Sequence, residues 1–220
     1  MKQKLESWLP PFVRIPLLLA LVINFLTYYG TKLVTTNAKH YDLTIGLDKA
    51  IPFVPFFISF YVLAYAQWVF SYIYHSKQSK TACNTIVSAN IITKIIASLF
   101  FLFLPTETVL PEIAGNSFWE QLTQFIYNAD TPRTLFPSLH CIESWLCFRS
   151  SFYVKNASKW YIFAQLAFSI MVFASTVFVK QHFIVDVFAG ILAAEIGLTI
   201  AKKKNFGTLF EKLQNKMKSS

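Results

Sequence analysis

The sequence predicts an all-α fold, a polytopic membrane bundle of about six transmembrane helices. Hydrophobic residues make up 55% of its 220 residues and charged residues only 14%, whereas a soluble domain carries about 25% charged residues. Several uninterrupted apolar runs approach the roughly 20 residues with which a helix crosses a bilayer. The chain has room for one such bundle, so we expect a single membrane-embedded domain over residues 1–220.

The first candidate span covers residues 15–29 and follows a basic N-terminal segment. A basic start before an apolar run is also typical of a signal peptide. This run, however, is long enough to span, and no small-x-small cleavage site follows it. We therefore expect it to stay in the protein.

Five further candidate spans follow, and the fourth span of the series is the least typical. It is short and contains Glu143 and Arg149, whose charges are costly in lipid. The five ranges are 52–74, 86–104, 139–154, 159–179 and 183–201.

Basic residues are distributed unequally between the two sides of this bundle. With a cytoplasmic N-terminus, 14 of the 20 lysines and arginines fall inside and five outside, and Lys94 lies within the third span. Cytoplasmic loops are typically enriched in Lys and Arg. We therefore expect both termini in the cytoplasm, the 105–136 loop outside, and the plasma membrane as the location.

The basic segment 202–220 places five apolar residues on one helical stripe: Phe206, Leu209, Phe210, Leu213 and Met217. This pattern is typical of an amphipathic helix at the membrane interface. A frayed basic tail explains the same residues equally well, so both interpretations stay open.

The net charge of +9 does not indicate nucleic-acid binding, because no basic stripe follows a soluble face. Positive-inside bias and contact with anionic lipid headgroups account for it. The three cysteines lack metal-type spacing and are expected to be small apolar residues in or near spans. We expect no metal and no cofactor, and membrane lipids as partners; the oligomeric state stays open.

Polar residues gather at the outer ends of the last three spans. The segment FPSLH brings Ser138 and His140 to the start of the fourth span. The short turn VKQHF, between the fifth and sixth spans, carries Lys180 and His182. Two histidines, a serine and a lysine therefore converge on one side of the membrane.

Asp186 lies four residues after His182, so the two side chains share one face of the sixth helix. A carboxylate inside a span usually has a partner, and the spacing makes His182 that partner. An Asp that accepts a hydrogen bond from one ring nitrogen leaves the other nitrogen as a nucleophile. A lone His–Asp pair would favour a structural link between helices, but the second histidine, His140, favours catalysis.

Two segments, FPSLH and STVFVKQHFIVD, resemble motifs of the type 2 phosphatidic acid phosphatase superfamily, which comprises membrane lipid-phosphate phosphatases and phosphotransferases. The family's middle motif is Pro-Ser-Gly-His. Pro137, Ser138 and His140 match it, with Leu139 at the glycine position. This Pro-Ser-Leu-His variant is similar to the branch that contains inositol-phosphorylceramide synthases.

The family's last motif is Ser-Arg, five residues, His, three residues, Asp, and Ser175, His182 and Asp186 match it. The resemblance implies that His182 attacks phosphorus and carries a phosphohistidine, which Asp186 orients. It also implies that His140 protonates the leaving alkoxide and then activates water, while Ser138 and nearby backbone N–H groups hold phosphate oxygens. Such a mechanism needs no metal.

Three cations of the family pattern are missing. Thr176 replaces the arginine of the last motif. The first motif, Lys, six residues, Arg-Pro, has Phe103 and Leu110 in place of its two basic residues. Phosphoryl transfer needs positive charge on the equatorial oxygens, so other residues have to supply it.

Lys180 and Arg133 are the predicted substitutes, and both, with Ser138 and Ser175, are candidate substrate-binding residues. Arg133 could equally be a solvated loop charge. Lys94 is a further candidate if it reaches the site and does not merely snorkel to the interface.

Three functions are compatible with these residues. The first is a phosphatase acting on a lipid phosphomonoester or diphosphate, such as phosphatidic acid, phosphatidylglycerol phosphate or a polyprenyl diphosphate. The second is a lipid phosphotransferase with an alcohol acceptor. The third is a non-catalytic membrane protein, which the missing cations favour. The two histidines and Asp186 favour catalysis, since a scaffold has no need of a nucleophile with its orienting acid.

Overall fold

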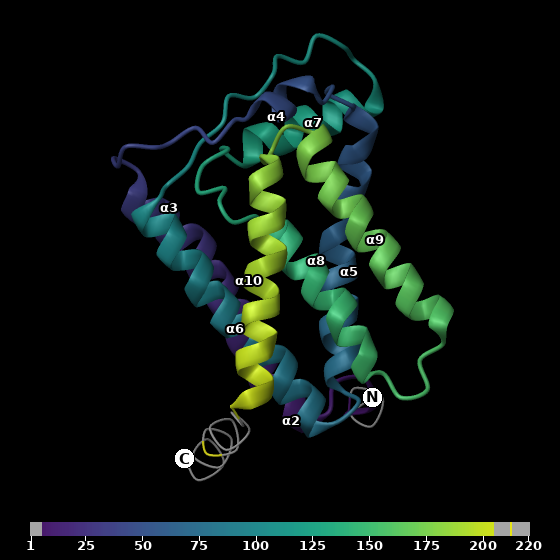
Figure 1. Ribbon diagram of the computed structural model, residues 1–220. Helices are drawn as coiled ribbons and strands as arrows, with labels where there is room; N and C mark the ends of the chain where they lie inside the picture. Colours follow the sequence, from purple (N-terminus) through teal and green to yellow (C-terminus); the bar gives the residue numbers. More distant parts are fainter. Residues whose placement is uncertain (1–5, 205–211, 213–220) are drawn as a thin grey trace.

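The computed structural model describes residues 6–204 and residue 212, and its regular elements are helices. Figure 1 shows long helices running side by side, with the short α4 and α7 at one end. The predicted helical membrane bundle is confirmed. The α-helices are α2 (Pro11–Phe25), α3 (Thr31–Thr35), α4 (Gly46–Ala50), α5 (Ile58–Ser76), α6 (Lys80–Phe103), α7 (Phe118–Ala129), α8 (Leu139–Ser150), α9 (Lys159–Phe178) and α10 (Ile184–Lys203).

Within residues 6–204, five segments are long and apolar enough to cross a membrane, and they correspond to five of the six expected spans. A π turn, Leu26–Gly30, joins α2 to α3 in the first of them, and a 3-10 turn, Pro55–Phe57, leads into α5 in the second. The five segments are Pro11–Thr35, Pro55–Ser76, Lys80–Phe103, Lys159–Phe178 and Ile184–Lys203.

The remaining expected span, 139–154, is the 12-residue α8 followed by a 3-10 turn, Ser151–Tyr153. It is shorter than a typical membrane-crossing helix. It packs against α5, α6, α9 and α10 inside the bundle, and eight of its 12 residues are buried (Figure 1). Since protein surrounds α8, it can hold the polar residues that a lipid-facing helix could not.

Glu143 of α8 accepts hydrogen bonds from two neighbouring helices and pairs with a lysine. The Lys94 Nζ on α6 lies 2.5 Å from its Oε1. Asn90 Nδ2 donates to the same oxygen at 2.9 Å, and the Tyr72 hydroxyl on α5 donates to Oε2 at 2.7 Å. Lys94 is fully buried, so it does not snorkel to the interface; the ion pair joins α6 to α8 inside the bundle.

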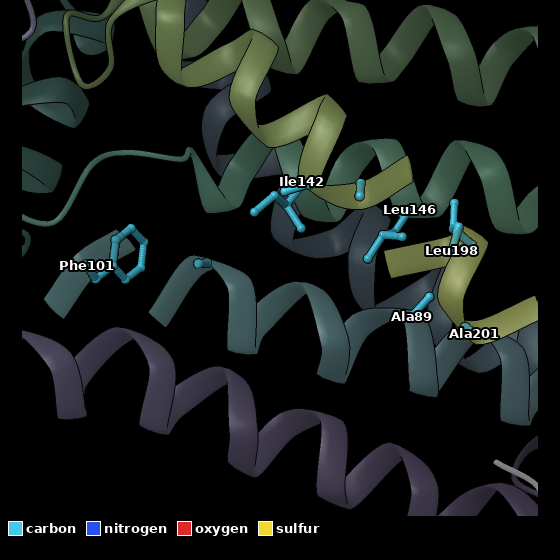
Figure 2. Packing of buried hydrophobic residues seen from close by; sticks show 9 residues of the cluster. Ala89, Phe101, Ile142, Leu146, Leu198 and Ala201 are labelled. Carbon is cyan, nitrogen blue, oxygen red and sulfur yellow. The ribbon is translucent and has the colours of Figure 1, made fainter. Parts of the chain in front are cut away.

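Small residues bring α6 and α10 into close contact. A Cβ on Gly197 would lie 2.2 Å from Thr93 Oγ1 and 2.9 Å from the Ala89 carbonyl oxygen, so only glycine fits there. Helices in membranes associate through such close packing, because lipid offers no hydrophobic driving force. In Figure 2, Ala89 of α6 and Ala201 of α10 lie near each other, beside Leu146 of α8.

The helix α2 begins and α10 ends at the same end of the bundle, opposite α4 and α7 (Figure 1). This arrangement is compatible with both termini on one side, as the charge distribution predicts. The predicted amphipathic helix of the 202–220 tail lies outside the described residues, except for Lys202–Lys204 and Lys212.

Candidate functional site

His182 and Asp186 form a hydrogen-bonded pair at the start of α10. The His182 Nδ1 lies 3.1 Å from Asp186 Oδ2, and the same oxygen accepts the Phe183 backbone N–H at 3.1 Å. Asp186 is fully buried, in the first helical turn, where the helix dipole favours a carboxylate. A hydrogen bond from Nδ1–H to Asp186 leaves Nε2 of His182 with its lone pair free for attack.

A tight turn between α9 and α10 positions His182. Both Gln181 N and His182 N donate to the Thr176 carbonyl oxygen, at 3.0 and 3.1 Å. Lys180 adopts the left-handed conformation, with φ of 56°, in which side chains with a Cβ are strained. The Tyr127 hydroxyl on α7 donates to the Val179 carbonyl at 2.6 Å. Burial raises the pKa of Tyr127, which keeps this donor protonated.

His140 and Ser138 approach this pair from α8. The His140 and His182 ring centroids are 6.2 Å apart. Ser138 caps α8, because its Oγ accepts the Cys141 N–H at 3.3 Å, and its own backbone N–H donates to the Asp186 carbonyl at 3.2 Å. The two segments that resemble the family motifs therefore meet through a direct backbone hydrogen bond.

Gly190 makes this approach possible. A Cβ at this position of α10 would lie 2.9 Å from the Ser138 carbonyl oxygen and 3.0 Å from Cys141 Cβ. Any larger residue would push the start of α8 away from α10. The distance between the two histidines thus depends on a glycine one helical turn beyond Asp186.

A small pocket of about 130 Å³ opens beside His182. Its lining combines two lysines and two threonines with a buried carboxylate: Thr44, Asp48, Lys49, Thr108, Val109, Val177, Lys180, His182 and Phe183. Lys49 is exposed. A pocket lined by the candidate nucleophile and by two lysines suits an anionic group.

The short helix α4 is fixed over this pocket from two sides. The Lys180 ammonium donates to the Asp48 and Ile51 carbonyls, at 2.8 and 2.5 Å. The Asp48 carboxylate accepts the Ile184 N–H at the start of α10 at 2.8 Å and the Ile45 N–H at 2.9 Å. Lys49 is consequently held close to the turn that carries His182.

Two of the other predicted residues lie apart from this pocket. Arg133 Nε is 3.6 Å from Glu107 Oε2, and both side chains are about half exposed. The Ser175 hydroxyl donates to the Val172 carbonyl of its own helix at 2.7 Å. Of the predicted residues, only His182 and Lys180 line the pocket. Asp186, His140 and Ser138 lie behind it, next to His182 or Asp186, and Arg133 and Ser175 are part of neither group.

Sequence reasoning missed Asp48 and Lys49. Both belong to the segment GLDKA, between the first two spans, far from the motifs along the chain. The only signal was an aspartate beside a lysine in a polar loop, which is typical of solvated loops. Their place over α10 depends on the path of that loop.

The site offers a nucleophile with its orienting acid and a second histidine for proton transfer, next to a pocket with two ammonium groups. This combination suits the transfer of an anionic group to His182.

Among curated proteins and among solved structures, no match was found. The model of one family, the PAP2 superfamily, matches residues 56–200, about two thirds of the chain, and includes both motif segments. The chain therefore belongs to the PAP2 superfamily.

Proposed function

We propose that this protein is an integral membrane lipid-phosphate phosphatase, which hydrolyses a phosphomonoester or diphosphate headgroup through a phosphohistidine. The observation that supports this most is the 3.1 Å hydrogen bond between Asp186 and His182, a residue that also lines a pocket with two lysines. A purely structural pair would have no need of a pocket beside its histidine.

In the proposed first step, the lone pair of His182 Nε2 attacks phosphorus, and the bond from phosphorus to the alkoxide oxygen breaks. Protonated His140 gives its proton to that oxygen. In the second step, neutral His140 takes a proton from water, whose oxygen attacks phosphorus and breaks the P–N bond. Inorganic phosphate leaves, and both histidines return to their starting states. Asp186 holds the Nδ1–H throughout.

The proposed phosphate ligands are Ser138, Lys180 and Lys49. Lys180 uses two of its three N–H donors on carbonyl oxygens, and the third is left for a phosphate oxygen. Arg133 and Ser175 would contribute only if their bonds to Glu107 and to the Val172 carbonyl opened.

Loss of Lys180 tests this ligand set. We expect Lys180→Gln to lower kcat/KM about 100- to 1000-fold, the usual cost of a lost group that stabilises transition-state charge. Lys39→Gln is the matched control, because Lys39 is an exposed lysine in the same outer loop as Lys49, and it should keep the wild-type rate. Thr176→Arg in the Lys180→Gln background should restore part of the activity. A near wild-type rate in Lys180→Gln would make Lys180 a structural tie for α4 only.

The function itself is tested by phosphate release in detergent from phosphatidic acid, phosphatidylglycerol phosphate and a polyprenyl diphosphate. Release is expected from at least one of them, and since the proposed mechanism uses two histidines, it should persist in EDTA. Full loss in EDTA with recovery on adding a divalent ion would contradict the metal-independent mechanism. No release from any substrate would contradict the phosphatase, and the absence of a new phosphoester with an added alcohol as well would favour a non-catalytic protein.

A phosphotransferase is the second candidate, favoured by Leu139 at the glycine position of the middle motif. This variant is similar to inositol-phosphorylceramide synthases. Adding alcohol acceptors such as inositol to the same reactions would distinguish the two functions, since a phosphotransferase forms a new phosphoester and releases little free phosphate.

We also propose that the site faces the outside of the plasma membrane. Ala114→Cys, in the exposed part of the 105–136 loop, should react with an impermeant thiol reagent on intact cells. Lys155→Cys, at the opposite end of the bundle, should react only after permeabilisation. Both require a background without the three native cysteines, which are buried. The reverse labelling pattern would invert the topology.

A further inference from the structure

Three aromatic residues of α5 surround the ring of His140. Tyr61, Tyr65 and Trp68 follow each other at intervals of four and three, so they share one helix face. The Tyr61 ring stacks on the imidazole, with centroids 3.9 Å apart and 25° between planes. The Tyr65 ring is nearly perpendicular to the imidazole, with centroids 5.4 Å apart and 81° between planes. The Trp68 ring is tilted by 60° from the imidazole plane, with centroids 5.0 Å apart.

This aromatic set is fixed from both helices. Tyr61 is almost fully buried, and the Trp68 indole N–H donates to Ser144 Oγ, one turn after His140 on α8, at 3.0 Å. Nε2 of His140 is buried and has no hydrogen-bond partner among the described residues. Ring contacts, and not hydrogen bonds to that nitrogen, therefore hold the imidazole.

The other groups around His140 do not favour a positive charge on its ring. Lys94 of α6 and His182 of the α9–α10 turn both act on it electrostatically, and each is paired with a carboxylate, Glu143 or Asp186. Further titratable groups nearby include Tyr61, Tyr65 and, on α8 itself, Cys141, and the Asp130 carboxylate interacts electrostatically with both tyrosines. A buried imidazolium is costly, whereas the faces of aromatic rings attract cations.

We infer that Tyr61, Tyr65 and Trp68 are positioning residues that hold His140 and stabilise its protonated form for proton transfer to the leaving group. The inference rests on the proposed function, in which His140 is the general acid. It adds residues of α5 that no motif contains. It also explains why a stripe of rings is stacked on a histidine and not on apolar core.

Tyr61→Leu tests the inference against Tyr61→Phe, which keeps the ring. We expect Tyr61→Leu to lower kcat about 30-fold, the equivalent of one desolvated cation–π contact, with KM changed by less than about threefold. The alkaline limb of its rate profile should move to lower pH by about 1.5 units, because the general acid loses its proton more readily. Tyr61→Phe should retain the wild-type rate and profile. Equal kinetics for both variants would overturn the inference.

A second measurement separates this inference from the proposed function. The protonation of His140 can be followed by NMR on histidine-labelled protein in lipid nanodiscs, with its signal assigned among the four histidines by its loss in His140→Gln. His140 should titrate at lower pH in Tyr61→Leu than in Tyr61→Phe and wild type, whether or not a substrate is turned over. Identical titration in all three proteins would show that the rings only fill space.

Discussion

His182→Ala is expected to abolish phosphate release, by at least about 10⁴-fold, while the protein stays folded and inserted in the membrane. Among the described residues, His182 has the only side chain that combines a hydrogen bond to Asp186 with a place in the pocket wall, and the substitution removes it. The fold should survive, because Asp186 Oδ2 retains the Phe183 N–H as a donor.

His40→Ala is the matched control for this result. His40 is a partly exposed histidine of the loop between α3 and α4, and its loss should leave the rate within about twofold of wild type, as for surface changes generally. Purified His182→Ala protein with near wild-type release would remove His182 from the mechanism.

Glu143→Leu is expected to destabilise the bundle by about 3–5 kcal/mol, because it leaves the buried Lys94 ammonium without its carboxylate partner. It also removes the acceptor for Asn90 and Tyr72. The free energy of unfolding in mixed micelles, measured by denaturant titration, gives the loss directly.

The double variant Lys94→Met, Glu143→Leu isolates the charge effect. Replacing both members of a buried ion pair by apolar residues is often close to neutral, so the double variant should recover most of the stability. If Glu143→Leu alone unfolds at the wild-type denaturant concentration, the Lys94–Glu143 pair contributes nothing to stability.

The five long helices were predictable, because each is an apolar run of spanning length with a polar interruption at both ends. The short α8 was harder to predict. Its charged and polar residues looked out of place in lipid, and only the structure shows that four other helices enclose it. There Glu143 forms an ion pair with Lys94, which lies on another helix about 50 residues earlier in the chain. Periodicity within one segment does not predict which residues of two distant segments form an ion pair.

The contact of His182 with Asp186 was predictable from their spacing of four on one helix, and the structure confirms it. The surroundings of Lys180, Arg133 and Lys49 were not predictable. The Lys180 ammonium donates to the Asp48 carbonyl of α4, and Arg133 pairs with Glu107. These contacts depend on the paths of the loops, which the sequence does not predict. No motif contains the aromatic set on α5, so its contacts with His140 were not predictable either.

The central claim, a phosphoryl group carried on His182, is tested most directly by trapping it. The purified protein is mixed with its lipid phosphate, quenched rapidly in base, in which phosphohistidine persists, and digested with trypsin. Cleavage after Lys180 and Lys202 yields the peptide 181–202, in which His182 is the only histidine. The account predicts one added phosphoryl group on this peptide, localised to His182, lost on acid treatment and absent from His182→Ala. Turnover with the phosphoryl group on another residue, or with no phosphorylated peptide at any quench time, would contradict it.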